Sequence, residues 1–327
     1  MVTTLAKVTL KSGESMAVVK TTAPEPDWID RLLPFLSHKG DSWLEPMRQA
    51  YSEGLDALTM NDFLGVLDSG EIVGNVTTIE HLGVGVLQHV FTPPEHRRKG
   101  IASALFRGLC GDFTARSCRA MYLSTGYDTP PYHIYESFGF VGRGDSGKMT
   151  WLPEAGFLET HFAPGPASIR DTRWEDWPLL EALYAITGQW QLKSFYFQQF
   201  GHAAYEGEYI GLRQGLAKGS ILGTRVLSSP EGAILGHALL AKQSAWRGRP
   251  LVLDFMVHAN FHERAAELAG SLKIPAGAKV QAFCDAQATA KIAALETLGF
   301  EQEGCFRGQI EDENHVPTDV LVFGKVG

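Results

Sequence analysis

One segment near residue 100 places a predicted strand, a short basic turn and a predicted helix in direct succession. The apolar run Val84–Phe91 precedes a turn at 97–102 with the sequence RRKGIA, and residues 103–118 repeat large apolar side chains at helical spacing. Gly100 lets the backbone approach a ligand closely, and a helix that begins just behind it leaves amide hydrogens free to meet an anion. The helix dipole adds to this attraction. The segment therefore predicts a phosphate or pyrophosphate site where a strand passes into a helix, which requires a fold that mixes the two.

The rest of the first half alternates short helical patterns with strand patterns. Apolar residues recur at helical spacing in 28–36 and 43–51, and two apolar runs flank the turn at 68–70, which predicts a β-hairpin. Further strands are expected at 120–124 and 147–151, and a short helix is expected at 132–138, where Gly139 ends it. This order predicts an α/β chain of the α+β type, with a mixed, mostly antiparallel sheet flanked by helices.

The second half repeats landmarks of the first at a nearly constant spacing. The Gly-Phe pair at 139–140 corresponds to the pair at 299–300, and the glycine at 74 in IVGN corresponds to the glycine at 236 in ILGH. These spacings are 299 − 139 = 160 and 236 − 74 = 162 residues, too long for a solenoid repeat. They predict two tandem domains of one fold. We expect an N-terminal domain at 1–161, a proline- and glycine-containing linker at 162–168, and a C-terminal domain at 169–327.

Composition narrows the class of protein and of partner. The chain has 327 residues with 44% hydrophobic and 20% charged side chains, which is ordinary for a globular protein and long enough for two cores. Its net charge is −8, and the basic residues cluster only at Arg97, Arg98 and Lys99. Because nucleic-acid binding needs a broad basic face, we expect no nucleic-acid partner.

Cysteine usage and hydropathy indicate a cytoplasmic protein without a membrane partner. The four cysteines form no Cys-x-x-Cys pair, which favours free thiols in a reducing compartment. No stretch approaches the ~20 apolar residues of a membrane span, and the N-terminus lacks the apolar core of a signal peptide. The spacing of His237, Asp254, His258 and His262 matches no common ligand pattern, so we expect no metal.

Two motifs resemble those of the GNAT acyltransferases. The spacing Arg97-x-x-Gly100-x-Ala102 matches the family's Q/R-x-x-G-x-G/A signature, and HIYESFGF at 133–140 resembles its LYEKLGF stretch. The resemblance implies that the turn holds the pyrophosphate of acetyl-coenzyme A and that Tyr135 protonates the departing thiolate. A phenol suits that task, because its ordinary pKa of ~10 keeps it protonated at neutral pH. The residues that the resemblance assigns to the cofactor are Val90, Phe91, Thr92, Arg97, Arg98, Lys99, Gly100, Ile101, Ala102, Ser103 and Tyr135.

The proton acceptor is where this sequence departs from the family. Many members carry a glutamate where this chain has Gln88, and an amide accepts no proton at neutral pH. His89 has the most suitable ordinary pKa, although strand alternation would direct it to the face opposite Gln88. Further candidates are Glu80, His81 and Asp128, and an amine that arrives unprotonated would need no base.

The second domain lacks both functional positions. The stretch 259–270 has no glycine at the required spacing, and Leu295 stands where the first domain has Tyr135. We therefore expect a degenerate copy that shapes the acceptor site or an interface, with a homodimer as one possible assembly.

The resemblance implies an N-acetyltransferase that moves acetyl from acetyl-coenzyme A to a primary amine of a small molecule by direct attack. Three alternatives stay open: a non-catalytic acyl-coenzyme A sensor, transfer of a longer acyl group, and acetylation of a protein amino group.

Overall fold

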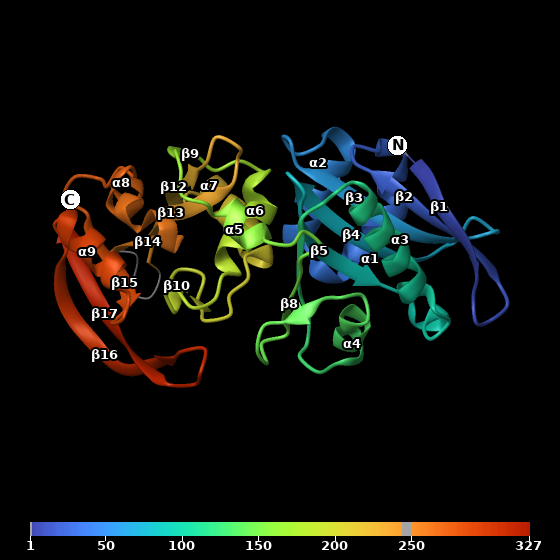
Figure 1. Ribbon diagram of the computed structural model, residues 1–327. Coiled ribbons are helices and arrows are strands. Elements are labelled where there is room, and N and C mark those ends of the chain that lie inside the picture. The colour runs from blue at the N-terminus through green and yellow to red at the C-terminus, as the bar shows by residue number, and fades with distance from the viewer. Residues whose placement is uncertain (1, 244–249) are drawn as a thin grey trace. The chain divides into compact units, whose positions relative to one another are not determined.

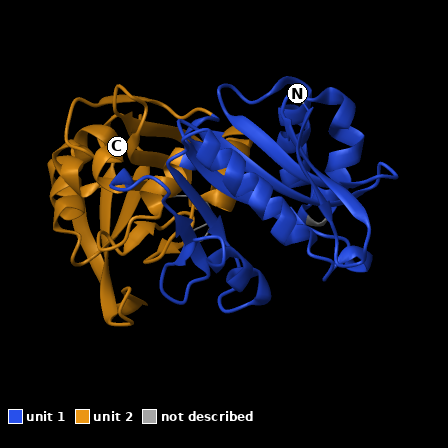
Figure 2. Ribbon diagram, turned by 45° about the vertical axis from the view of Figure 1, so that its right-hand side comes forward, with its two compact units in different colours: residues 1–157, 174–178 blue, residues 158–173, 179–327 orange. Residues whose placement is uncertain are grey.

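A computed structural model describes residues 2–243 and 250–327 of the chain. Two compact units divide it: residues 1–157 with 174–178, and residues 158–173 with 179–327 (Figure 2). Each unit is built on one mixed sheet with helices on it, so the predicted α+β fold class is confirmed. Among the described residues, no helix has the length and apolar character needed to cross a membrane.

The sheet of the N-terminal unit has eight strands within the described residues, in the order β1-β2-β3-β4-β5-β6-β8-β7 (Figure 1). All neighbours pair antiparallel except β5 and β6, which are parallel. The strands are β1 (Val2–Thr9), β2 (Ser15–Thr22), β3 (Thr59–Leu67), β4 (Ile72–His81), β5 (Val84–Phe91), β6 (Ala120–Ser124), β7 (Val141–Gly142) and β8 (Lys148–Trp151).

The helices of this unit are η1 (Pro26–Trp28), α1 (Ile29–Leu36), η2 (Ser37–Lys39), α2 (Asp41–Glu53), η3 (Pro94–His96), α3 (Ile101–Ala115) and α4 (Pro130–Glu136). Successive residues of a strand face opposite sides of a sheet. Phe63 of β3 packs in the core with Phe106 of α3, whereas its neighbour Asp62 faces Tyr51 of α2. The sheet therefore carries α3 on one face and α2 on the other.

The C-terminal unit has a seven-stranded sheet within the described residues, in the order β16-β17-β15-β14-β13-β12-β9. Read from β9, the strands of this sheet follow the same order along the chain as the strands of the first sheet read from β2. The one parallel pair among the described strands is again formed by the fourth and fifth strands, which here are β14 and β15. The strands are β9 (Ser168–Asp171), β12 (Ile221–Ser228), β13 (Ile234–Lys242), β14 (Leu251–Val257), β15 (Lys279–Asp285), β16 (Glu301–Glu311) and β17 (Pro317–Val326), and β10 (Leu192–Ser194) and β11 (Gln199–Phe200) pair separately.

The helices of the second unit also occupy matching places along the chain. They are α7 (Glu206–Lys218), η4 (Ala259–Arg264), α8 (Ala265–Gly270) and α9 (Thr289–Thr297), and α8 and α9 follow their strands as α3 and α4 do. Two further helices, α5 (Phe157–His161) and α6 (Asp176–Tyr184), have residues in both units. A glycine at the same place in each unit explains part of this correspondence between the two folds. A Cβ on Gly74 would lie 2.8 Å from Ile101 of α3, and a Cβ on Gly236 would lie 2.9 Å from Leu268 of α8. Both units therefore need a residue without a side chain at the same place, so that a helix can pack closely on the sheet.

Element boundaries differ from expectation at two helices. The helix expected at 103–118 begins at Ile101, because Gly100 supplies the turn directly before it. The helix expected at 132–138 begins at Pro130, since proline is tolerated in the first turn of a helix, where its missing N–H costs nothing. The hairpin of β1 and β2 is a further element that the sequence patterns do not predict.

Gly74→Ala should lower the free energy of unfolding by about 1–3 kcal/mol, because the added methyl group would also lie 3.3 Å from the carbonyl oxygen of Phe91. Gly111→Ala is the matched control. This glycine of α3 is exposed, and a methyl group added to it would meet open space, so alanine should stabilise the helix by about 0.5–1 kcal/mol. Urea denaturation of the full chain measures both effects, and equal effects would contradict this packing.

Candidate functional site

Strands β5 and β6 separate within the N-terminal sheet. Their pairing joins Val84–Val86 to residues 120–122, and among the described residues the register goes no further. The later part of β5, with Val90 and Phe91, therefore presents one backbone edge to a gap. An edge of this kind can pair with an extended ligand, as it would with another strand.

A β-bulge lies on β5 where the separation begins. Leu87 pairs with Thr78 and His89 pairs with Thr77, so Gln88 is the extra residue. The strict alternation between Gln88 and His89 that the sequence suggests is interrupted at this point. The backbone oxygen of Gln88 accepts a hydrogen bond from Lys39 Nζ at 2.8 Å.

The side-chain amide of Gln88 is buried, with 4% of its surface exposed, and neither its Nε2 nor its Oε1 has a hydrogen-bond partner among the described residues. Leaving such groups unsatisfied is costly, so buried amides nearly always meet protein, water or ligand. Gln88 is thus a polar group at the gap with its bonding capacity unused.

The turn before α3 has the geometry of an anion site. Gly100 is the N-cap of α3 with φ 90° and ψ 8°, a left-handed conformation that L side chains rarely adopt, and open space surrounds its Cα. The first intrahelical bond runs from the Ala104 amide to the Gly100 oxygen. The amides of Ile101, Ala102 and Ser103 therefore have no acceptor within the helix and carry the positive end of its dipole.

The three basic side chains of the turn differ in their contacts and in their exposure. Arg97 Nε donates to the backbone oxygen of Thr92 at 3.0 Å, and Lys99 Nζ pairs with Glu14 Oε2 at 3.2 Å. Arg97 and Arg98 are exposed, whereas Lys99 is partly buried. Glu14 offsets the charge of Lys99, so the two arginines provide most of the positive charge available to a ligand.

Tyr135 of α4 is buried, with 6% of its surface exposed. Its ring centroid lies 5.1 Å from that of Phe106 on α3 and 6.2 Å from that of Phe140. These contacts fix the phenol ring in the core that joins α4 to the helix carrying the anion site. Tyr132 of the same helix is also buried and packs edge-on against Tyr127, with centroids 5.5 Å apart.

Two of the other candidate proton acceptors are engaged in ion pairs. Arg116 Nη1 lies 2.5 Å from Glu80 Oε2, and His133 Nε2 lies 3.0 Å from Asp128 Oδ1. Each contact occupies one oxygen of the carboxylate that it reaches. His81 closes β4 and is partly buried, whereas His89 lies on β5 at the gap and is 4% exposed.

Sequence reasoning missed a buried polar row that leads to His89. Register places Thr21, Asp62, Thr77 and His89 opposite one another on β2, β3, β4 and β5, and side chains at paired positions share one face. Thr77 Oγ1 donates to Asp62 Oδ1 at 2.6 Å. The available signal was a carboxylate in the middle of the mostly buried strand TMNDFLGVL.

Asp62 is fully buried, and no ion pair within the described residues gives it a cationic partner. Burial raises its pKa to about 6, and hydrogen bonds from Thr77 and Tyr51 oppose the rise. Asn75 Nδ2 also donates to Thr77 Oγ1 at 3.2 Å. A carboxyl group that changes charge near neutral pH therefore lies in the sheet beneath α2.

In the C-terminal unit, aromatic residues lie beside the corresponding gap, together with a cavity of about 260 Å³ that Trp190, His262 and Asp285 help to line. Within the described part of the chain, strands β14 and β15 pair only at residues 251–252 and 280–281. Beyond that point Trp190 stacks on His262 with centroids 5.0 Å apart and packs against Phe255 at 5.9 Å. Lys291 Nζ lies 5.4 Å from the Trp190 ring, and Leu295, at the place of Tyr135, is fully buried.

The four residues of the second half considered above as metal ligands take part in other contacts. His237 bonds the Tyr184 hydroxyl at 3.1 Å, and Asp254 Oδ2 accepts from Ser194 Oγ at 2.5 Å. Burial lowers the pKa of His258 to about 4, and His258 stacks on Phe162. The described residues include no group of three or more histidine, cysteine or acidic side chains suited to a metal ion.

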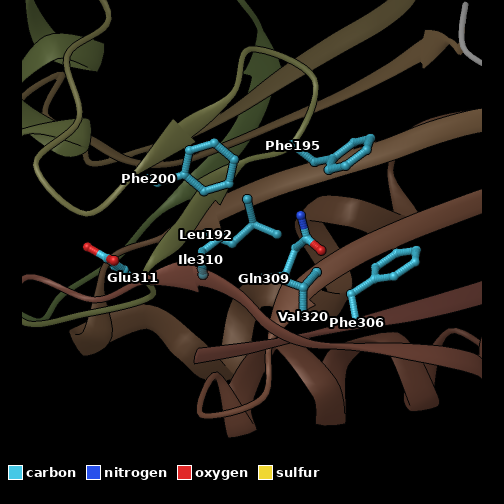
Figure 3. A pocket seen from close by; sticks show the side chains of 8 residues that line it. All are labelled: Leu192, Phe195, Phe200, Phe306, Gln309, Ile310, Glu311 and Val320. Carbon is cyan, nitrogen blue, oxygen red and sulfur yellow. The ribbon is translucent and has the colours of Figure 1, made fainter. Parts of the chain in front are cut away.

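An apolar cavity of about 580 Å³ lies elsewhere in the C-terminal unit, between the β10–β11 segment and the β16–β17 hairpin (Figure 3). Its lining is Leu192, Phe195, Phe200, Phe306, Gln309, Ile310, Glu311 and Val320. None of the residues predicted from the sequence contributes to it. The cavity is therefore separate from the candidate site, whose residues all belong to the N-terminal unit.

Comparison with known proteins agrees with the sequence motifs. Residues 27–140, within the N-terminal half of the chain, match the model of the acetyltransferase (GNAT) family. No curated protein matches the chain.

Several solved structures resemble half of this chain. An N-acetyltransferase from Staphylococcus aureus is 16% identical and aligns 50% of this chain with 99% of its own, with a TM-score of 0.38. A phosphinothricin acetyltransferase from Sinorhizobium meliloti, in complex with AcCoA, is 18% identical over 49% of this chain and 88% of its own, with a TM-score of 0.38. A spermidine N-acetyltransferase from Vibrio cholerae, in complex with CoA and spermine, is 13% identical over 49% of this chain and 95% of its own, with a TM-score of 0.37.

Asp62→Asn should gain stability relative to the parent as pH rises from about 4 to about 7. The unfolded chain releases the Asp62 proton near the ordinary value of 3.8, whereas the folded chain keeps it up to about 6. Between these values the unfolded state binds fewer protons, so the parent loses up to roughly 3 kcal/mol as pH rises. Asparagine does not titrate. Urea denaturation at several pH values measures the difference, and a difference independent of pH would contradict the burial of this carboxyl group.

Proposed function

We propose that the N-terminal unit transfers acetyl from acetyl-coenzyme A to a primary amine of a small molecule by direct attack. The observation that carries this proposal is the Gly100-capped start of α3 beside the separated edge of β5. Together they offer an anion site next to an extended backbone, which are the two features that a pyrophosphate followed by an amide-containing arm requires.

The residues present fit the cofactor. Free amides of Ile101, Ala102 and Ser103 would hold the pyrophosphate, with added charge from Arg97, Arg98 and Lys99. The open space at Gly100 leaves room for a phosphate to approach the backbone. Val90, Phe91 and Thr92 would pair with the pantetheine arm along the free edge of β5.

Acetyl-coenzyme A supplies the acetyl group as an activated thioester. A backbone amide of β5 aimed at the thioester oxygen would stabilise the charge that develops there, an effect worth ~3 kcal/mol in such sites. His89 takes the proton of the attacking amine, Tyr135 gives a proton to the departing thiolate, and the Gln88 amide orients the acceptor. No covalent enzyme intermediate is required, since the amine is itself the nucleophile.

The C-terminal unit is proposed to be a degenerate copy of the same fold. Its sheet has the same strand order, yet no glycine directly precedes α8, and Trp190 stacks on His262 beside the gap. This copy would therefore bind no coenzyme A and would serve the acceptor site or an interface, for which a homodimer is one candidate.

Gln88 favours a second candidate function, a non-catalytic acyl-coenzyme A sensor, because the side chain at this position is an amide that cannot act as a base. A panel of small amines, peptide amino termini and acyl-coenzyme A chain lengths separates the candidates. Release of free thiol with a small amine supports the enzyme, whereas tight coenzyme A binding without thiol release for any acceptor supports the sensor.

Gly100→Glu should weaken coenzyme A binding by about 100-fold or more. Two like charges ~4 Å apart near a protein surface repel by about 4 kcal/mol, and the new carboxylate would face the pyrophosphate. The control is Gly111→Glu, which adds the same charge at an exposed position later in α3. Isothermal titration calorimetry measures the affinity. If Gly100→Glu binds coenzyme A as the parent does, the anion site is assigned wrongly.

Tyr135→Phe should lower turnover about 100-fold, because loss of a general acid typically costs two orders of magnitude or more. The ring contacts with Phe106 and Phe140 survive the change, so coenzyme A affinity and melting temperature should stay near the parent values. Steady-state kinetics and calorimetry together test this. A variant with parental turnover would remove Tyr135 from the mechanism.

A further inference from the structure

We propose that the apolar cavity between the β10–β11 segment and the β16–β17 hairpin is a binding site for an organic amine with an apolar body. The body would lie among the aromatic side chains of the cavity, and the ammonium group would lie beside Glu311. This inference goes beyond the proposed function, because it concerns the C-terminal unit and requires no catalysis by the N-terminal unit.

The cavity lies between two segments that are much shorter in the first unit. Residues 37–40 join α1 to α2 there, whereas residues 185–205 join α6 to α7 in the second half and contain β10 and β11. The strands β16 and β17 take the places of β7 and β8 in the sheet order and are far longer. The first sheet forms the same order without these extensions, so the fold alone does not account for them.

Contacts outside the cavity hold its walls in place. Phe195 stacks on Phe283 with ring centroids 3.7 Å apart, and the Leu192 amide donates to Asp285 Oδ2 at 3.1 Å. Small-molecule sites are largely formed before binding, are mostly apolar and enclose roughly 300–1,000 Å³. The cavity, at about 580 Å³, meets each of these conditions.

A β-bulge shapes the opposite wall. The register of β16 on β17 shifts between Phe306 and Ile310, which both line the cavity. Asp319 of β17 anchors the bulge, since its Oδ1 accepts the Gly308 amide at 2.7 Å. A bulge changes the direction of the side chains that it carries. Figure 3 shows the amide of Gln309, which belongs to this bulge, among the apolar side chains.

Two large aromatic side chains of the lining are exposed. Phe200 is 38% exposed and Phe306 is 48% exposed. Single exposed apolar residues are common, but two that line one apolar cavity are typical of a binding surface. Their rings can cover an apolar body, and the face of an aromatic ring also attracts a cation.

Glu311 determines the charge of the ligand. It is the one ionisable side chain of the lining within the described part of the chain, and Figure 3 shows its carboxylate at the edge. Its Oε2 lies 3.2 Å from His315 Nδ1, whereas its Oε1 has no hydrogen bond or ion pair with the described residues. A carboxylate at this edge attracts an ammonium group and repels an anion such as a fatty acid. The amide of Gln309 adds a neutral donor and acceptor.

The test uses three probes that share one apolar body: 4-phenylbutylamine, 4-phenylbutanol and 4-phenylbutyrate. Because the proposed function gives the N-terminal unit an amine site of its own, the measurement has to report on this cavity. The NMR signal of the Ile310 δ1 methyl group in the full chain does so, and the peak lost in Ile310→Val assigns it. The amine should shift this signal with a Kd of about 1 mM or tighter. It should bind about 5-fold more tightly than the alcohol and about 10-fold more tightly than the carboxylate.

Two variants test the residues. Glu311→Gln should remove the preference for the amine over the alcohol, and Phe306→Ala should weaken binding of the amine by about 10-fold. The controls are Glu301→Gln, an exposed acid of the same strand, and Leu222→Ala, an exposed apolar residue of β12. Neither control residue lines the cavity, so both should bind the amine as the parent does.

Failure of all three probes to shift the Ile310 signal would overturn the proposal, and so would equal affinity for the three. A second copy of the chain in the cavity would also overturn it. In that case the parent would sediment as a dimer, Phe306→Ala would sediment as a monomer, and the probes would not reach Ile310. None of these results depends on acetyl transfer, so the absence of turnover would contradict the proposed function and leave this proposal to the NMR titration.

Discussion

The early end of the pairing between β5 and β6 is the constraint on which the rest of the candidate site depends. Among the described residues, the two strands pair only at 84–86 and 120–122, so the sheet opens in the middle while its outer strands stay joined. The opening frees a backbone edge of β5, and α3 begins beside it because the chain leaves β5 through a short turn. Gly74 then lets Ile101 approach the sheet closely, which holds the start of the helix in place.

The two units have different residues at the corresponding opening of the sheet. In the first, the gap borders a glycine-capped helix and the unsatisfied amide of Gln88. In the second, Trp190 packs on His262 and Phe255. A cavity of about 260 Å³ lies beside Trp190 and His262, so the two units line the opening with different side chains.

Local patterns predicted most of the elements that carry the site. The strand Val84–Phe91 and the turn at 68–70 appear where alternation and turn residues indicated them, and the helix after Gly100 begins within two residues of its expected start. These features depend on neighbours in sequence. The bulge at Gln88 does not, because it exists only relative to the register of β4, and no local pattern specifies that register.

Asp62 escaped prediction for the same reason. Its partners Tyr51 and Thr77 come from a helix and a strand on either side of it in sequence, and a single acid within an apolar strand has no local signature. Tyr135 was predicted from a motif, yet its near-complete burial against Phe106 depends on how α4 packs on α3. Tertiary contacts set the chemical state of a side chain, and sequence reasoning has least access to them.

The second sheet offers an internal comparison for the buried row. With Gly74 matched to Gly236, Thr77 corresponds to Leu239, whose pairing partners are Thr224 and Asp254. The row Asp62–Thr77–His89 is thus replaced by one with no hydroxyl at its centre and no histidine at its end. Asp254 instead accepts hydrogen bonds from the Ser194 hydroxyl and the Tyr196 amide.

The difference between the two rows raises the question of why the first unit contains the buried carboxyl group of Asp62, which lowers its stability. A fully buried carboxyl group without a cation lowers stability at neutral pH, and the residue at the matching place in the second sheet is Thr224, whose side chain carries no charge. The polar row persists in the unit that has the anion site and is interrupted in the unit that lacks it. Stability at neutral pH favours an uncharged side chain such as that of Thr224, so stability does not account for a buried carboxyl group in the unit that has the anion site.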